Sequence, residues 1–512
     1  MRRADSRLTA MLQTTPEITP FTNEPFTDFS KEANVQAFQD ALQRIEKRLP
    51  VVVRLWIDGK DEEGVGAFES LDPGQTSRVV ANCAKGSRDE AVRAIAGANK
   101  AFPAWSAKSC TERADYLFRA ARAMRLRKHE FSAMMVYEVG KSWVEADGDT
   151  AEAIDFLEFY AREALRYGRK QPITPSSGED NELLYVPLGV GAVIPPWNFP
   201  LAILAGMTTA ALVTGNTVVL KPSSDSPGIA SMFVDLLKEV GIPDGVLQFV
   251  PGPGGDVGNT LVEHPMIRFI SFTGSAEVGK GIYEKAGRTP DGQIWLKRVV
   301  AEMGGKDFIF ADEDADPEFV AKQAFAAAFG FQGQKCSACS RLILHEKIHD
   351  AVVGKLVPMT EAAKVGHPSD HTNFMGPLVN APALAKTLEY IEIGKTESAL
   401  VAGGERAGDD GHYLRPTVFT GVERHHRLFR EEIFAPVLAV TKVADFEAGL
   451  EACNDTIFGL TGAYIGKDED KIARAKRELH CGNLYINRKC TGALVGVHPF
   501  GGFNMSGTDS KA

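Results

Sequence analysis

The chain has 512 residues, of which 44% are hydrophobic and 24% charged, as expected for a globular protein large enough for two or three domains. Its formal net charge of −10 argues against a general role on nucleic acid or on an anionic membrane, because both favour clustered Lys and Arg. No apolar run approaches the roughly 20 residues that a bilayer span requires. We therefore expect a protein that acts on neither nucleic acid nor membrane.

The first residues and the cysteines bear on the compartment. "MRRADSRLTAMLQ" has arginines but no apolar core and no small-residue cleavage site, which excludes an ordinary secretory signal and leaves a short organellar presequence open. The seven cysteines are scattered and odd in number, which fits a reducing compartment without a disulfide framework. We predict a cytoplasmic protein.

The N-terminal third reads as largely helical. Residues 30–48 have apolar positions at helical spacing and predict a surface helix, and "VVVRLWIDG" (51–59) predicts one strand. Three amphipathic segments follow, each beginning near Ser, Thr or Asp as a plausible N-cap: 87–105, 111–141 and 149–168. The stretch 171–189 is rich in turn formers and predicts a loop or an exposed hairpin.

After residue 189 short β-rich runs alternate with helical stretches. The runs are "VGAVIPPWNFP", "GNTVVLKPSSDSP", "VLQFVPGPG" and "IRFISFTGS", and each ends in a turn. Strands that alternate with helices imply a parallel, doubly wound sheet. A second alternation begins near residue 300 with "KDFIFAD" and continues to "SRLILHE". The sequence therefore predicts two α/β domains.

Ligands of an open parallel sheet bind beyond the carboxyl ends of its strands. "FTGSAEVGKG" offers Gly274, Ser275 and Gly279 at such a turn, and "GPGGDVG" only approximates a nucleotide-binding loop. On glycine spacing alone, nucleotide binding and plain strand-to-helix turns are equally good interpretations. Lys221 ends another strand, where it could bind a ribose or simply lie on the surface.

Two cysteines three residues apart, Cys336 and Cys339, lie among small and polar residues in "GQKCSACSR". A metal site would need further ligands, and no second CxxC pair occurs. A nucleophilic cysteine instead needs an oxyanion site and a base. Asn198 in "PPWNFP" could donate to an oxyanion, and Glu302 in "AEMGGKD" could act as the base, although buried Asn and Glu are often merely hydrogen-bonded.

Seven motifs occur in a fixed order: "PWNFP", "KPS", "FTGS", "EMGGK", "GQKCSACSR", "EEIFAPV" and "PFGGFNMSG". From about residue 50 to the end, this series resembles the aldehyde dehydrogenase superfamily. The resemblance implies an α/β protein with a Rossmann-like NAD(P) domain, a second α/β catalytic domain and a β-flap that joins subunits into a homo-oligomer. Relatives continue for some thirty residues beyond "SGT", so the C-terminus is expected to be short.

The resemblance also implies domain boundaries. Residues 1–48 would form an N-terminal helical arm. The NAD(P)-binding domain would comprise 49–170 and 189–299, and the catalytic domain 300–484. The oligomerisation flap and a substrate anchor loop would comprise 171–188 and 485–512.

Catalytic roles follow from the same resemblance. Cys336 would attack an aldehyde, and the Asn198 amide with the Cys336 N–H would stabilise the oxyanion by about 3 kcal/mol per donor. Glu302 would activate the water that hydrolyses the thioester. Cys339 would be a packed bystander, and no metal is expected.

For the cofactor, the resemblance places Lys221 on the adenosine ribose, Ser275 on the pyrophosphate, and Glu432 and Phe434 on the nicotinamide ribose. NAD-preferring relatives often carry Glu where this chain has Ser224, and serine would not repel a 2′-phosphate. We therefore expect NAD, with NADP tolerated. The remaining predicted cofactor residues are Pro196, Trp197, Gly254, Gly258, Gly274 and Gly279.

Within the superfamily, "YEVGKSWVEADGDTAEAI" and "NLYINRKCTGALVGVHPFGGF" are most similar to the members that oxidise L-glutamate γ-semialdehyde, the open form of Δ1-pyrroline-5-carboxylate, to L-glutamate in proline catabolism. Glu152 would face the substrate ammonium, although on sequence alone it reads as a solvated helix residue. The other implied substrate residues are Ser337, Gly492 and Ala493 on the carboxylate, Phe199 and Phe500 on the aliphatic middle, which otherwise read as core, and Lys335 for positive potential.

Three alternatives remain open at this level. The substrate could be another acidic semialdehyde, such as succinate or aminoadipate semialdehyde. The chain could also be a silent binding protein on the same fold, or a Cys-His hydrolase.

Overall fold

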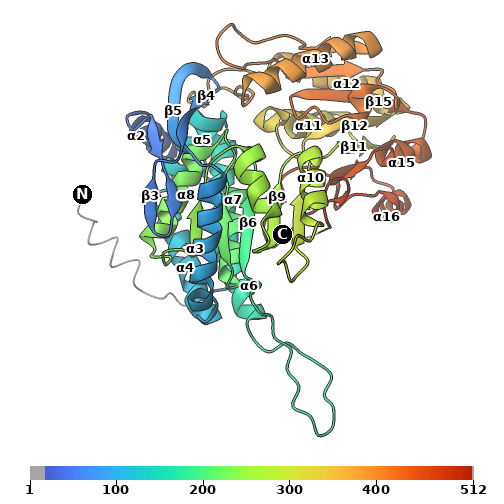
Figure 1. Cartoon of the computed structure of the whole chain (residues 1–512). Coiled ribbons are helices and arrows are strands. Elements are labelled where there is room, and N and C mark those ends of the chain that lie inside the picture. The colour runs from blue at the N-terminus through green and yellow to red at the C-terminus, as the bar shows by residue number, and fades with distance from the viewer. Residues whose placement is uncertain (1–17, 510–512) are drawn as a thin grey trace.

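The computed structural model describes residues 18–509. Two seven-stranded sheets form its centre, one from the N-terminal half and one from the C-terminal half (Figure 1). The first sheet has the order β10-β9-β6-β7-β8-β2-β3. Its strands are β2 (Leu55–Ile57), β3 (Lys60–Glu62), β6 (Val190–Ile194), β7 (Thr217–Leu220), β8 (Leu247–Phe249), β9 (Ile267–Thr273) and β10 (Arg298–Glu302). The strands from β10 to β8 are parallel, as predicted.

Helices cover both faces of this sheet, so its central strands β6 and β7 are buried and largely apolar. On β7, Val218 and Leu220 pack against one cluster of buried residues and Val219 against another on the opposite face, because successive side chains of a strand point to opposite faces. The covering helices are α3 (Arg88–Ser106), α7 (Ala202–Val213), α8 (Pro227–Glu239), α9 (Asn259–Glu263) and α10 (Ala276–Ala286), with a π-helical turn η1 (Gly254–Gly258) before α9.

The three predicted helical segments between residues 87 and 170 are four helices, α3 to α6. The segment 111–141 divides at Arg127 into α4 (Cys110–Leu126) and α5 (Lys128–Val139). Arg127 leaves the helical conformation without a Gly or Pro, so the sequence carries no local signal for the break. The last helix, α6 (Trp143–Tyr167), begins six residues earlier than predicted.

The predicted single strand 51–59 is also two strands. β1 (Val51–Val53) joins a three-stranded sheet with β5 (Gln75–Lys85) and β4 (Gly66–Asp72), whereas β2 joins the first seven-stranded sheet. Only exposed Arg54 separates them. Val53, Leu55 and Ile57 are buried at every second position through both strands. Because this alternation is unbroken, the sequence does not show that the chain passes from one sheet to another. The predicted N-terminal helix is α2 (Glu32–Glu46).

The second sheet has the order β13-β14-β15-β12-β11-β17-β18, parallel except at the edge strand β13. Its strands are β11 (Asp307–Ala311), β12 (Cys339–His345), β13 (Ala399–Ala402), β14 (Thr417–Thr420), β15 (Val437–Val443), β17 (Thr461–Ile465) and β18 (Asn483–Ile486). A small pair, β16 (Phe458–Gly459) and β19 (Phe503–Asn504), lies beside it. The helices of this half are α11 (Pro317–Phe329), η2 (Gly330–Gly333), α12 (Glu346–Glu361), α13 (Ala381–Glu397), α14 (Arg427–Arg430), α15 (Phe446–Asn454) and α16 (Glu469–Glu478).

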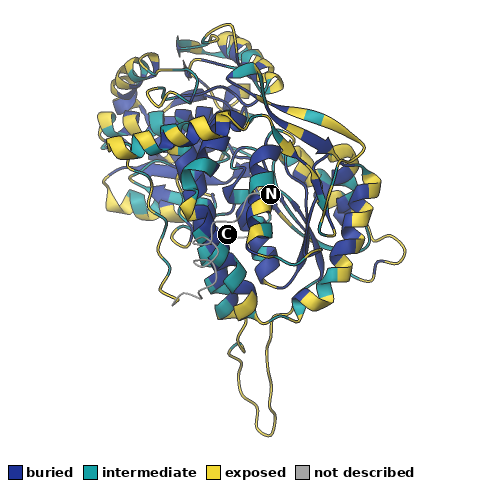
Figure 2. Ribbon diagram, turned by 90° about the vertical axis from the view of Figure 1, so that its left-hand side faces the viewer, coloured by how far each residue is buried: buried dark blue, intermediate teal, exposed yellow. Residues whose placement is uncertain are grey.

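Residues 171–188 protrude from the body of the molecule and are exposed along most of their length (Figure 2). Within this segment Gln171 and Leu183 form an isolated antiparallel bridge. Among residues 18–509, no helix combines the length and apolar character needed to cross a membrane.

Candidate active site

The predicted cofactor residues gather at one edge of the first sheet. Pro196 and Trp197 follow β6, Lys221 follows β7, the turn with Gly254 and Gly258 follows β8, and Gly274 follows β9. Because these parallel strands end at the same edge, their turns form a continuous rim. Ser275 caps α10 there, its hydroxyl accepting from the Val278 N–H at 3.3 Å.

Several rim residues touch one another. A Cβ on Gly258 would lie 3.7 Å from the Cδ of Lys221, so the lysine side chain reaches the η1 turn. Burial lowers the pKa of Lys221 to about 8, and its ammonium donates to the Pro222 carbonyl at 3.0 Å. The Gly274 N–H donates to the Glu302 carbonyl, joining this turn to the end of β10. Ser224 is exposed at the rim.

Cys336 lies in a turn between η2 and β12, after a backbone segment of unusual conformation. Phe331 and Gln332 have φ of +47° and +57°, which side-chain-bearing residues rarely adopt. The Gln332 amide donates to the carbonyls of Gly140 at 3.0 Å and Pro377 at 2.8 Å, which fixes the segment from two sides. The nucleophile turn, residues 331–337, is therefore held by parts of the chain remote in sequence.

Asn198, which follows β6 in the first sheet, contacts this turn from the other half of the chain. Its amide nitrogen donates to the Gln334 carbonyl at 3.1 Å, two residues before Cys336. Trp197 stands edge-on to Phe331 and Phe434, with ring centroids 6.4 Å and 5.7 Å away. The first sheet and the second half of the chain thus meet at the predicted nucleophile.

Glu302 ends β10, and the two glycines after it permit close approaches. A Cβ on Gly305 would lie 2.7 Å from the Cys336 carbonyl oxygen, and a Cβ on Gly304 would lie 2.0 Å from a Glu432 carboxylate oxygen. The Gly305 N–H donates to Glu432 at 2.9 Å. The segment 302–305 therefore passes between Cys336 and Glu432, which brings three predicted residues together.

The thiol of Cys336 is surrounded by acidic groups. Burial, together with the carboxylates of Asp307, Glu302, Glu432 and Glu152, raises its pKa well above the usual value. The thiol is therefore protonated at neutral pH in the protein alone, and attack on a carbonyl requires the proton to leave. Cys339 is buried.

One face of α6 presents three carboxylates, Glu145, Asp149 and Glu152, spaced by four and three residues. Asp149 pairs with Lys141 at 2.7 Å, and Glu145 pairs with Lys335 at 2.7 Å. The positive charge predicted for Lys335 is therefore largely balanced. Burial and the charge of Asp149 raise the pKa of Glu152 to about 8. Within residues 18–509, no lysine or arginine forms an ion pair with Glu152.

The predicted anchor loop contacts the backbone of the nucleophile turn. Cys490 Sγ lies 3.5 Å from the Ser337 carbonyl oxygen. Gly492 has φ of +82°, and its carbonyl accepts from Arg488 at 3.1 Å. Among described groups, neither the Gly492 N–H nor the Ala493 N–H finds an acceptor. Among described residues, two backbone donors are thus left open two and three residues after Cys490, which contacts Ser337.

The two predicted substrate phenylalanines are partly buried. The ammonium of Lys141 stands 4.0 Å from the centre of the Phe199 ring. Phe500 lies in a loop that Asn483 holds by accepting from Gly501 and donating to Pro499. No hydrogen bond or ring contact among described residues joins Phe500 to Phe199.

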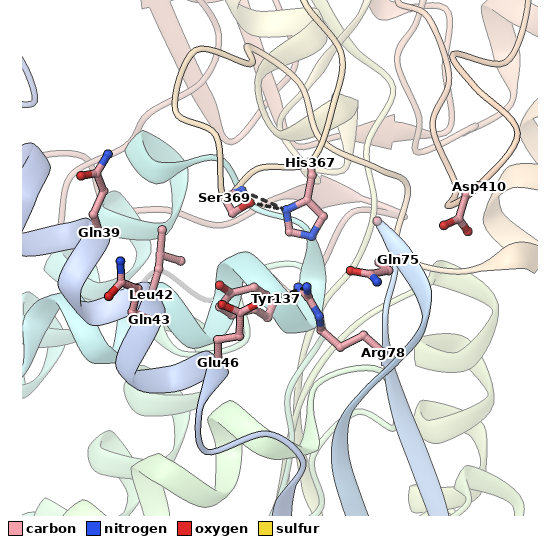
Figure 3. Close-up of a pocket in the computed structure, with 11 residues that line it drawn as sticks. Gln39, Leu42, Gln43, Glu46, Gln75, Arg78, Tyr137, His367, Ser369 and Asp410 are labelled. Atoms are coloured by element: carbon pink, nitrogen blue, oxygen red, sulfur yellow. Dashed lines mark hydrogen bonds and ion pairs between the residues drawn. The ribbon is translucent and has the colours of Figure 1, made fainter.

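A cavity of about 730 Å³ lies elsewhere and is lined by none of the predicted residues (Figure 3). It is lined by α2, the start of β5, α5 and the loops around His367 and Asp410. Arg78 there pairs with Glu46 and Asp72, and His367 contacts both Asp72 and Ser369. Because its charged groups satisfy one another, we assign the chemistry to the Cys336 site.

A group of potential metal ligands, Asp312, Glu313 and His345, lies on the second sheet. Lys471 pairs with both carboxylates, at 2.8 Å and 3.2 Å, and the His345 ring accepts from the Lys347 N–H. The lysine ammonium already occupies the position that a cation would take.

Sequence reasoning missed several residues that shape the site. Ser506 donates to the Gly304 carbonyl at 2.8 Å, and its own carbonyl accepts from the Met303 N–H at 2.7 Å. Asp307 accepts from the Thr461 N–H at 2.6 Å, and burial raises its pKa to about 8. Lys141 and Asp149 were also missed. Ser506 lies within the quoted stretch "PFGGFNMSG" and Asp307 within "AEMGGKD", so both motifs offered a signal that was not used.

Comparison with known proteins agrees with this geometry. A model of the aldehyde dehydrogenase family matches residues 56–512. The 1-pyrroline-5-carboxylate dehydrogenase of Anoxybacillus flavithermus is 52% identical over 495 residues, covering 97% of this chain and 96% of that protein. The 1-pyrroline-5-carboxylate dehydrogenase 2 of Bacillus subtilis is 50% identical over 494 residues, covering 96% of each.

Among solved structures, 1-pyrroline-5-carboxylate dehydrogenase from Thermus with bound NAD superimposes with a TM-score of 0.95 at 48% identity. The match covers 97% of this chain and 96% of that one. Both the identity and the coverage extend over the two sheets and the turns described above. The chain therefore belongs to the aldehyde dehydrogenase family.

Proposed function

We propose that this protein oxidises L-glutamate γ-semialdehyde, the open form of Δ1-pyrroline-5-carboxylate, to L-glutamate with NAD. The assignment of this substrate rests on the arrangement of polar groups around the nucleophile turn. Among residues 18–509, Glu152 is the carboxylate of its helix face that pairs with no lysine, and the N–H groups of Gly492 and Ala493 find no acceptor. An ammonium and a carboxylate on one substrate carbon would complement these groups.

The proposed chemistry begins with the Cys336 sulfur. As a thiolate it adds to the aldehyde carbon, and the carbonyl oxygen becomes an oxyanion that the Asn198 amide and the Cys336 N–H stabilise. NAD, when bound at the rim, supplies the hydride acceptor that lets the adduct become a thioester. Glu302 then removes a proton from water, which attacks the thioester carbon and releases the acid and the Cys336 thiolate.

The rim supports a dinucleotide. Ser275 at the N-terminus of α10 suits a pyrophosphate, since helix N-termini attract anions. Lys221 reaches the same turn from β7, and Glu432 and Phe434 stand at the other end of the rim near Cys336. Ser224 is uncharged and exposed, so we propose NAD as cofactor with NADP tolerated.

Three further parts of the proposal concern assembly, location and domains. The protruding segment 171–188 exposes Leu183, Leu184, Tyr185 and Val186, which supports a flap that joins copies into a homo-oligomer. All seven cysteines are free thiols, which supports a cytoplasmic location. The two separate sheets support the predicted division near residue 300.

The test is NADH formation from L-pyrroline-5-carboxylate by the wild type and by Cys336→Ala, with propanal and succinate semialdehyde as comparison substrates. We expect pyrroline-5-carboxylate to give the highest kcat/KM and the variant to be inactive. Preference for succinate semialdehyde would overturn the substrate and the role of Glu152. Turnover by Cys336→Ala would overturn the nucleophile.

A further inference from the structure

A fully buried ion pair lies where α5 ends and α6 begins. The Lys141 ammonium and an Asp149 carboxylate oxygen are 2.7 Å apart, and both side chains are 0% exposed. Desolvation offsets much of the attraction in such a pair, and apolar replacements are often as stable. Stability alone is therefore a weak explanation for placing two charges here.

The Lys141 ammonium also faces two aromatic rings, one next to Asn198 and one at the start of the nucleophile turn. The ammonium is 4.0 Å from the centre of Phe199 and 4.5 Å from the centre of Phe331. Phe199 follows Asn198 directly, and Phe331 begins the nucleophile turn. A cation is attracted to a ring face, and more strongly when both are removed from water.

Groups at and beside the ion pair also form hydrogen bonds to the segment after Asn198 and to the nucleophile turn. The Asp149 carboxylate accepts from the Ala202 N–H at 2.6 Å, at the start of α7 beyond Asn198. The carbonyl of Gly140, next to Lys141, accepts from the Gln332 amide at 3.0 Å in the nucleophile turn. The two segments meet again where Asn198 donates to the Gln334 carbonyl.

We propose that Lys141, held by Asp149, is a positioning residue that fixes the Asn198 amide relative to the Cys336 turn through the rings of Phe199 and Phe331. The inference rests on the proposed roles of Asn198 and Cys336 but not on the identity of the aldehyde. A displacement of about 1 Å between reacting groups can cost about 100-fold in rate. Loss of Lys141 would therefore lower kcat and leave cofactor binding unchanged.

Charge is a competing explanation, because Lys141 also lowers the pKa of Glu145 and of Glu152. Propanal separates the two explanations. Propanal carries no ammonium or carboxylate, so Glu152 can affect its turnover only through the pKa of the Cys336 thiol. The pH dependence of Cys336 alkylation reports that pKa directly, so a loss of kcat that persists where the alkylation rates match is a positioning defect. A positioning defect, in contrast, affects every aldehyde.

The experiment compares Lys141→Met, Asp149→Asn and the double variant with a matched control, Lys128→Met. Lys128 pairs with Asp147 at 3.0 Å across the same two helices, at the opposite end of α5 from Lys141. The measurements are kcat and KM with propanal, KM for NAD, the rate of Cys336 alkylation by iodoacetamide, and Tm.

We expect both single variants to lower Tm, because each leaves one buried charge alone, and the double variant to regain much of it. In the double variant kcat should remain about 100-fold low and the alkylation rate should change, with KM for NAD within about twofold. Lys128→Met should keep the wild-type kcat. Recovery of kcat together with Tm would show a purely structural pair and overturn the proposal.

A further variant tests the proposal if the ion-pair variants do not fold. Phe331→Leu keeps the ion pair and removes one ring, so it should lower kcat with propanal by about tenfold without a large change in KM for NAD. Wild-type kcat in that variant would also overturn the proposal. If the wild type oxidises aldehydes and Cys336→Ala does not, such a result leaves the proposed function intact; an inactive wild type would reject the proposed function itself.

Discussion

The cofactor rim and the nucleophile turn are built in different ways. At the rim, each group stands on a short turn after its own strand, so its place follows from the order of strands in one sheet. At the nucleophile turn, Gln332 bonds to Gly140 and Pro377, and Asn198 bonds to Gln334. The rim can therefore tolerate local change, whereas the turn depends on contacts from several parts of the chain.

The largest effect is expected from Gly305→Ala. Its Cβ would lie 2.4 Å from Asp307 Oδ2 and 2.7 Å from the Cys336 carbonyl oxygen, so the turn must shift. We expect kcat to fall by about 100-fold or more. Steady-state kinetics on purified protein, with circular dichroism to verify the fold, measures this.

Gly281→Ala is the control on the rim side. A Cβ at Gly281 in α10 meets no atom within 4 Å, so activity should stay near that of the wild type. The helix should also gain up to about 1 kcal/mol, because Ala has the higher helix propensity. Equal loss of activity in both variants would remove the distinction between rim and turn.

Gln332→Ala tests whether the left-handed segment needs its two hydrogen bonds. Each buried carbonyl left without a donor costs about 1–3 kcal/mol, so the free energy of unfolding should drop by about 2–6 kcal/mol. We expect kcat to fall about tenfold as the turn loosens. Urea unfolding and kinetics measure both effects, with Gln36→Ala on the exposed face of α2 as the control. Unchanged kcat would show that the turn is held without Gln332.

Glu152→Gln tests the ammonium contact through pH. The pKa of Glu152 is raised to about 8, so the carboxylate that binds an ammonium becomes populated as pH rises towards 8. The affinity for L-glutamate relative to glutarate, which lacks the ammonium, should therefore increase between about pH 6 and pH 8.

In Glu152→Gln this increase should disappear, and L-glutamate should bind about tenfold more weakly at pH 8. Inhibition constants of the two diacids avoid the ring-opening equilibrium of the substrate. Glu163→Gln, on the same helix but paired with exposed Arg166, should behave as the wild type. A ratio of affinities independent of pH in the wild type would contradict the assignment.

The smallest effect is expected at the rim itself. Ser224→Glu places a carboxylate beside the proposed adenosine ribose, and its repulsion of a 2′-phosphate should raise KM for NADP about fivefold while KM for NAD changes little. Ser224→Ala is the neutral control. Equal effects on NAD and NADP would place Ser224 away from the 2′ position.

Alternating strands and helices predicted the α/β fold, because they are local patterns, whereas the residues of the rim were implied by the resemblance to a family. The sequence did not predict what holds the nucleophile turn. The partners there are separated by 45 residues for Gln332 and Pro377 and by 136 for Asn198 and Gln334. Side chains that meet across such separations leave no periodic trace in the sequence.

Two errors have the same origin. The break between α4 and α5 at Arg127 and the change of sheet at Arg54 occur without Gly or Pro, so tertiary packing sets them rather than local preference. Lys141 and Asp149 look like ordinary charges at the end of one helix and the surface of the next. Only the packing of α5 and α6 shows that both are buried.

The support of Glu302 by Ser506 has a consequence for synthesis of the protein on the ribosome. Ser506 follows Gly304 by 202 residues. At about 5–20 residues per second, it emerges about 10–40 s after the segment that it fixes. During that interval the Met303 N–H and the Gly304 carbonyl have no Ser506 to bind. A nascent chain that already contains Asn198, Glu302 and Cys336 would therefore lack this support, and on the proposed mechanism hydrolytic competence should appear only after residue 506 has been translated.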